Sequence, residues 1–101
     1  MTLRLTFRRR AEWDLEGILD WVGQDFPARG HAAVRRIRAA CEVLPDIPLL
    51  GVRRDDMGPG LRLLVIEGRV NVIYRILPDR VQIVRVFWAG RDAATQIRRD
   101  T

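Results

Sequence analysis

The stretch from Leu61 to Trp88, LRLLVIEGRVNVIYRILPDRVQIVRVFW, predicts the fold of this chain. It contains three apolar runs rich in Val, Ile and Leu, separated by short polar breaks at Gly68 and at residues 78–80. Runs of this length between turn residues are typical of consecutive antiparallel strands. Pro78 has no amide hydrogen to donate within a sheet, so it marks the second turn independently of composition. We therefore predict a three-stranded antiparallel meander.

The parity of the side chains predicts which residues face a core, because successive strand residues point to opposite faces of a sheet. We expect the core face to carry Leu61, Leu63, Val65, Val70, Val72, Tyr74, Ile76, Val84, Val86 and Trp88. The opposite, open face then carries Arg62, Leu64, Ile66, Asn71, Ile73, Arg75, Leu77, Ile83, Arg85 and Phe87. Aliphatic residues mixed with arginines favour an interaction surface. The alternative interpretation is that the C-terminal segment covers this face.

The residues before the meander predict one further strand and a first helix. Apolar residues at positions 3, 5 and 7 alternate with polar ones, which indicates a short strand. An apolar stripe at helical spacing runs from Ala11 to Phe26, and Pro27 limits that helix. We expect Trp21 to lie in the core and Trp13 on the wet face. An exposed Trp13 is a candidate anchor for a partner, and packing against a neighbouring loop is the alternative.

A second helix is predicted from about Ala28 to Leu44, and Pro45 and Pro48 end it. The short connection between the two helices predicts an antiparallel helix hairpin. Residues 49–60 are predicted to form a loop, and residues 91–99 a short C-terminal helix. An N-terminal strand, a helix hairpin, a meander and a C-terminal helix define an α+β fold. The length predicts a single domain over residues 1–101.

The composition limits the possible chemistry. The net charge of +5 and the pI near 11.1 favour acidic partners, either nucleic acid or an acidic protein. All basic residues are arginines, so mechanisms that need a lysine amine are excluded. A single cysteine, Cys41, and a single histidine, His31, predict no internal disulfide, no metal site and no cofactor. No apolar run approaches the ~20 residues of a membrane span, and we expect a cytoplasmic protein.

Several short patterns occur in a consistent order along the chain. They are Ala11-x-x-Asp14-Leu15-x-x-Ile18 followed by an aromatic residue, Leu44-x-x-x-Pro48-x-x-Gly51, Gly60-x-Arg62, Tyr74-Arg75, and a last strand from Ile83 that leads to Arg91-Asp92. In this order they resemble the ParE/RelE toxin superfamily of bacterial type II toxin–antitoxin modules, and specifically its ParE-like branch. No single pattern is specific, but together they cover about residues 7–97.

The resemblance implies a toxin that binds and poisons DNA gyrase and that a small cognate antitoxin neutralises. The candidates for target binding are Arg62, Arg85 and Arg91. The candidates for antitoxin binding are the open-face residues Leu64, Ile66, Ile73, Arg75, Ile83 and Phe87. We expect the antitoxin to be acidic and ParD-like, and operator DNA to be contacted only through the antitoxin complex.

The alternative function is that of a RelE-type ribosome-dependent mRNA endoribonuclease. The RelE-like branch resembles nucleases that place lysine, arginine and histidine or tyrosine around the cleaved phosphate, and Arg62 and Arg85 match its arginine positions. RNA cleavage needs groups that exchange a proton or stabilise the phosphate charge. Here Trp88 stands where much of the superfamily carries histidine, and Tyr74 is expected in the core. We therefore predict no catalytic residues and a chain that is not an enzyme.

A plain nucleic-acid-binding module is a third possibility. The arginines are spread over the predicted helices and strands, and no aromatic platform for base stacking is evident. This hypothesis is therefore the least favoured.

Overall fold

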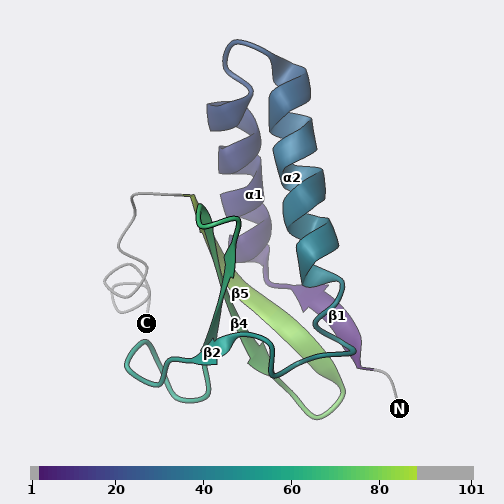
Figure 1. Ribbon diagram of the computed structural model, residues 1–101, viewed down its shortest axis with the longest axis vertical. Coiled ribbons are helices and arrows are strands. Elements are labelled where there is room, and N and C mark those ends of the chain that lie inside the picture. The colour runs from purple at the N-terminus through teal and green to yellow at the C-terminus, as the bar shows by residue number, and fades with distance from the viewer. Residues whose placement is uncertain (1–2, 89–101) are drawn as a thin grey trace.

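The computed structural model of the protein describes residues 3–88. The strands are β1 (Arg4–Phe7), β2 (Val52–Arg53), β3 (Arg62–Ile66), β4 (Val70–Ile76) and β5 (Arg80–Trp88), and the helices are α1 (Arg9–Val22) and α2 (Pro27–Cys41). The strands form one sheet in the order β1-β5-β4-β3-β2, and the two helices stand as a hairpin beside it (Figure 1). The predicted α+β fold is therefore confirmed.

The predicted meander is confirmed, because β3 pairs antiparallel with β4 and β4 pairs antiparallel with β5. The predicted N-terminal strand is present as β1, which pairs in parallel with β5. The short β2 lies within residues 49–60, where we predicted only a loop, and pairs with the first two residues of β3. The predicted C-terminal helix over residues 91–99 lies outside the described residues.

The helix hairpin extends beyond the sheet, and the turn between α1 and α2 forms the top of the molecule in Figure 1. Pro27 occupies the first turn of α2, where its missing amide hydrogen leaves no helical bond unmade. Within residues 3–88, neither helix is both long and apolar enough to cross a lipid bilayer.

The protein buries apolar residues on both faces of the sheet. The larger cluster lies between the sheet and the helices, and its fully buried members include Leu15, Ile37, Leu44, Val72 and Tyr74. A smaller second cluster on the opposite face consists of Met57, Leu61, Ile73, Val84 and Phe87, with Leu63 packed against it. The open face that we predicted is therefore a second, covered core.

The predicted faces of β3 are inverted. The register pairs Leu63 with Ile73 and Leu64 with Val72. Paired residues share a face, so Leu64 and Ile66 lie in the helix-side core, whereas Leu61 and Leu63 belong to the second cluster. The physical reason is the turn between β3 and β4, where Glu67 and Gly68 both have positive φ values of 54° and 62°. The geometry of this turn fixes how β3 aligns with β4. Alternation within β3 shows which residues share a face, but it does not show which of the two faces lies against the helices.

A bulge in β5 reverses its parity. Ile73 pairs with Arg85 and Tyr74 pairs with Ile83, so Val84 is an extra residue between the two pairs. An extra residue turns the side chains on one side of it to the other face. Ile83, predicted on the open face, therefore lies in the helix-side core. Val84, predicted in that core, lies in the second cluster.

Two apolar residues of the first helical segment are exposed, contrary to prediction. Trp21 is 63% exposed and Phe26 is 59% exposed, whereas we expected both to face the core. Phe26 lies in the turn of the hairpin, which extends beyond the sheet (Figure 1), and Trp21 lies on the side of α1 that lines an open groove beside the end of β5. Trp13 is 55% exposed, and its predicted position on the wet face is confirmed.

Candidate functional site

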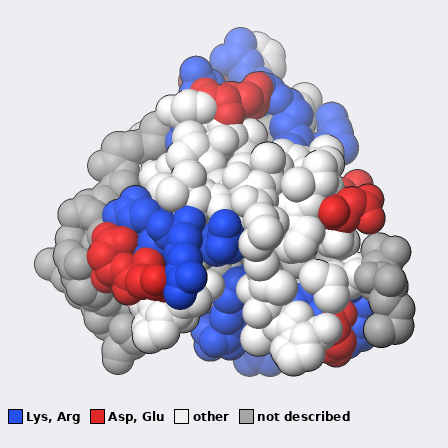
Figure 2. Space-filling model, turned by 60° about the horizontal axis from the view of Figure 1, so that its bottom comes forward, with Lys and Arg blue, Asp and Glu red and all other residues white. Residues whose placement is uncertain are grey.

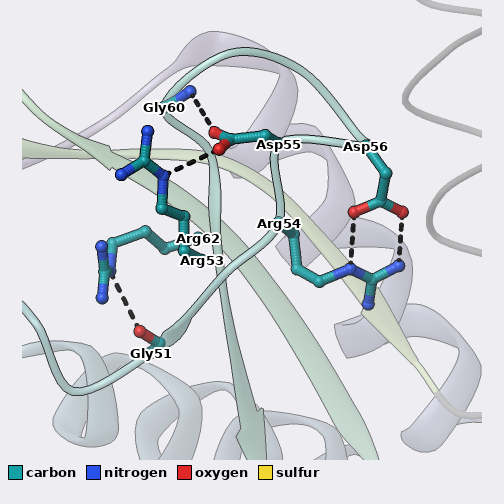
Figure 3. Close-up of polar contacts among 7 residues, drawn as sticks. All are labelled: Gly51, Arg53, Arg54, Asp55, Asp56, Gly60 and Arg62. Carbon is teal, nitrogen blue, oxygen red and sulfur yellow. Dashed lines mark hydrogen bonds and ion pairs between the residues drawn. The ribbon is translucent and has the colours of Figure 1, made fainter.

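The loop between β2 and β3 brings charged side chains together at one end of the sheet (Figure 3). Asp55 accepts hydrogen bonds from the Nε of Arg53 at 2.8 Å and from the backbone N–H of Gly60 at 3.0 Å. Asp56 binds Arg54 through two bonds of 2.8 Å, which raise the pKa of Arg54 above its ordinary value. These contacts fold the loop onto itself and place two arginines at its surface.

Arg62, a predicted target-binding residue, lies at the start of β3 and is half-buried. Its Nε donates to the carbonyl oxygen of Gly51 at 3.0 Å, and its Nη2 donates to the carbonyl oxygen of Leu49 at 3.4 Å. The guanidinium thus attaches the segment before β2 to the sheet. The side chain of Arg62 therefore stabilises this part of the fold.

Tyr74 is fully buried on the helix side of β4, as we predicted. Its hydroxyl oxygen accepts the backbone N–H of Gly51 at 2.7 Å and donates to the carbonyl oxygen of Pro48 at 2.7 Å. A Cβ at position 51 would lie 2.6 Å from the tyrosine ring, so only glycine fits there without displacement of the ring. Two separate sequence patterns, one with Pro48 and Gly51 and one with Tyr74, therefore meet in one structural contact.

Arg85, the second target-binding candidate, is buried and only 4% exposed. Its Nε and Nη2 bind the Oδ2 and Oδ1 of Asp14 in α1 at 2.7 and 3.1 Å. The Oδ2 of Asp14 also accepts the backbone N–H of Val86 at 2.9 Å. This arrangement joins α1 to the half of β5 that extends beyond its pairing with β1. The Arg85 guanidinium is therefore not presented at the surface.

The antitoxin-binding candidates do not share one surface. Ile66, Ile73, Ile83 and Phe87 are buried, and only Leu64 and Arg75 remain partly exposed. Leu64 lies on the helix side, whereas Arg75 lies on the opposite face and donates to Gln82 at 2.8 Å. The third target-binding candidate, Arg91, lies outside the described residues.

Exposed apolar residues gather instead in the segment that leads into β2. Leu49, Leu50 and Val52 are exposed, and Val52 is followed by Arg53. The space-filling view shows charged groups of both signs beside a broad uncharged surface at this end of the molecule (Figure 2). We overlooked these residues because we assigned residues 49–60 to a loop. The available signal was the run Leu49-Leu50-x-Val52, which is unusually apolar for an exposed connection.

A groove of about 320 Å³ lies between α1 and the end of β5. The described residues that line it include Trp13, Gly17 and Trp21 from the helix and Val86, Phe87 and Trp88 from the strand. Trp88, whose position we considered above for a catalytic histidine, therefore lines this groove. Asp14, whose carboxylate binds Arg85, also lines the groove.

The described part of the chain contains no cluster of three or more His, Cys, Asp or Glu side chains that could hold a metal ion. Cys41 is fully buried, and its burial raises the pKa of the thiol to about 12. It is therefore protonated and inert in the folded protein.

The helix hairpin, the antiparallel meander and the β1 strand that pairs with β5 define a RelE/ParE-like α+β fold. Residues 5–93 match the family model described as "ParE toxin of type II toxin-antitoxin system, parDE". The chain belongs to this family of ParE toxins.

Solved structures agree with this assignment. A chain of the chromosomal ParDE toxin–antitoxin system from P. aeruginosa is 25% identical, with a TM-score of 0.77 over 88% of this chain and 98% of that one. A conserved hypothetical protein from Helicobacter pylori is 16% identical, with a TM-score of 0.52 over 85% of this chain and 93% of that one, and it supports the fold alone. No curated protein matches the chain.

Proposed function

We propose that this ParE toxin acts by binding a protein rather than by cleaving RNA, that DNA gyrase is its target, and that an acidic antitoxin neutralises it. The observation that carries the proposal is that the side chains of Arg62, Tyr74 and Arg85 all make structural contacts. These are the residues that a RelE-type nuclease would place around a phosphate, and each is engaged in a contact that holds the fold together.

The protonation chemistry of a nuclease has little support in this arrangement. Both hydrogen bonds of the Tyr74 hydroxyl are made to backbone groups, so its proton is held by the Pro48 carbonyl. His31 lies in the first turns of α2, at the top of Figure 1, whereas the segment bound by Arg62 and Tyr74 lies near the bottom. Proton transfer requires a group within hydrogen-bond reach of the reacting atom. This separation supports a toxin that works through contact.

The antitoxin surface that we propose is the edge formed by Leu49, Leu50, Val52 and Arg53. It replaces the open face, whose apolar members are buried. An amphipathic acidic segment would cover the three aliphatic side chains and present carboxylates to Arg53. Burying an exposed leucine or valine gains roughly 1.5–3 kcal/mol, so this small surface can supply much of an affinity. The net charge of +5 would accelerate the encounter with an acidic partner.

The antitoxin surface is tested by a pull-down with the acidic antitoxin encoded beside this chain. Leu49→Asp and Val52→Asp place a charge among exposed residues, so the fold should persist while binding weakens by more than tenfold. Trp21→Ala is the control, because Trp21 is also exposed but lies on the helix hairpin. Binding that survives both aspartate variants and is lost with Trp21→Ala would place the antitoxin on the helices instead.

The cellular target is tested by expression of the chain without its antitoxin. We expect DNA replication to stop and the DNA-damage response to rise before protein synthesis falls. Operator DNA should be bound only when the antitoxin is present. A fall in translation that precedes any effect on replication would contradict a gyrase target.

A further inference from the structure

The exposed face of α1 carries a stripe that the proposed function does not use. Trp13, Gly17 and Trp21 are spaced by four residues, so they follow one another along one side of the helix. All three line the groove beside the end of β5. Exposed tryptophans next to a groove are frequent anchors of protein interfaces.

Gly17 in the middle of this stripe is not explained by the fold described here. Apart from its chain neighbours and the backbone of its own helix, no atom lies within 4 Å of the position that a Cβ would occupy, so an alanine would fit. A glycine inside a helix costs about 1 kcal/mol relative to alanine. The space over Gly17 is open, so the helix backbone is accessible there to a molecule that approaches from outside. A glycine leaves a notch into which a large side chain of another molecule can be inserted.

The charges on the exposed side of α1 indicate what that molecule is. The helix begins with the exposed Arg9 and Arg10, and further along it carries the exposed Glu16 and Asp20. Glu16 and Asp20 would repel an acidic partner. A second α1 running in the opposite direction would instead place its own arginines beside them. The helix is therefore complementary to an antiparallel copy of itself.

We infer that two copies of this chain associate through α1 about a two-fold axis near residue 15. Residues 13 and 17 are equally far from that point, and so are residues 10 and 20. Trp13 of each copy then fits over Gly17 of the other, and Arg10 of each copy faces Asp20 of the other. Every contact occurs twice, as in an isologous interface. This dimer of the toxin is independent of the antitoxin surface proposed above.

The expected affinity is modest. The contact consists of one helix and the adjoining groove, and we expect it to bury less than the ~800 Å² per partner of a standard interface. We expect a dissociation constant on the order of micromolar, because few contacts are available to offset the cost of association. The dimer should therefore form in solutions of the purified chain and dissociate on dilution.

Sedimentation equilibrium of the full-length chain, free of antitoxin, tests the dimer across concentrations around the expected constant. Gly17→Leu fills the notch and Trp13→Ala removes the side chain that enters it. Each should weaken dimerisation at least tenfold while far-UV circular dichroism stays unchanged. Phe26→Ala removes an exposed aromatic residue outside the contact and should leave the constant unchanged. A monomer at every concentration, or equal weakening by Phe26→Ala, would overturn the inference.

A charge exchange provides the second test. Arg10→Asp and Asp20→Arg should each weaken the dimer, because both create two like-charge contacts across the axis. The double variant restores opposite charges at both places and should recover most of the wild-type affinity. A double variant as weak as the single ones would show that these residues do not face each other, and would overturn the proposed arrangement.

Discussion

Arg85 and Arg62 lie on strands of the same sheet, and both were predicted to contact a target, but their surroundings differ. Arg85 is buried against the carboxylate of Asp14, and the side chains of this pair are 5% and 13% exposed. Arg62 is half-buried and donates to neutral carbonyl groups of the segment before β2. A buried ion pair is part of the fold, because neither charge tolerates the loss of its partner. A half-buried arginine that donates to neutral carbonyl groups can be lost at smaller cost.

The largest effect expected from this comparison is that of Asp14→Ala. It removes the carboxylate that binds the buried Arg85 and accepts the backbone N–H of Val86, so the free energy of unfolding should fall by about 3–5 kcal/mol. Urea denaturation measures the change. In the folded protein, a pKa of about 12 keeps the Cys41 thiol unreactive. The less stable variant unfolds more often, so alkylation of Cys41 at pH 8 should become faster. Asp25→Ala in the exposed turn between α1 and α2 is the control, and a similar loss for both variants would refute the distinction.

A smaller effect is expected for Tyr74→Phe, which keeps the ring and removes the hydroxyl. The buried N–H of Gly51 then has no acceptor, which costs about 1–3 kcal/mol in the free energy of unfolding. Amide exchange at Gly51 should accelerate more than exchange in β5. Unchanged protection at Gly51 would mean that the tyrosine does not hold this segment.

Arg62→Ala should cost about 1 kcal/mol, because the carbonyl groups that it releases lie near solvent. The loss should be local, with faster amide exchange in residues 49–53 and little change in the helix hairpin. Urea denaturation measures the global loss of stability, and amide exchange on the same sample measures the local loss. If Arg62→Ala lowered the global stability as much as Asp14→Ala, Arg62 and Arg85 would contribute equally to the fold, contrary to this comparison.

The smallest effect is expected for Arg54→Ala. Its ion pair with Asp56 lies at the surface, and exposed pairs contribute about 0–1 kcal/mol. The midpoint of urea unfolding should be nearly unchanged. Any small difference between the variant and the wild type should disappear at high salt. A loss above that range would show that the loop between β2 and β3 is coupled to the core.

The elements of the fold could be predicted because their signals are local. Pro27, Pro78 and Gly68 mark turns wherever they occur, and the apolar periodicities identify both helices and the three long strands. The faces of the strands could not be predicted in the same way. They depend on the turn at Glu67 and on the bulge at Val84, and each of these reverses parity in a whole strand or half of one.

The candidate site shows the same limit. Tyr74 was correctly placed in the core from its position in an unbroken apolar row. The burial of Arg85 depends on Asp14, which lies 71 residues earlier in the chain. A contact of that range is set by how α1 lies along β5, and no spacing within the last strand encodes it. Trp21 was misplaced for a related reason, since the length of the hairpin relative to the sheet is a property of the whole fold.

The central claim, that this ParE toxin binds rather than cleaves, is tested most directly by two assays on one preparation of the purified chain. Ribosomes programmed with mRNA report cleavage, and DNA gyrase reports supercoiling. We predict intact mRNA and inhibited supercoiling, because Arg62, Tyr74 and Arg85 are held in structural contacts. Specific cleavage of mRNA at the ribosomal A site, with supercoiling unaffected, would contradict this account.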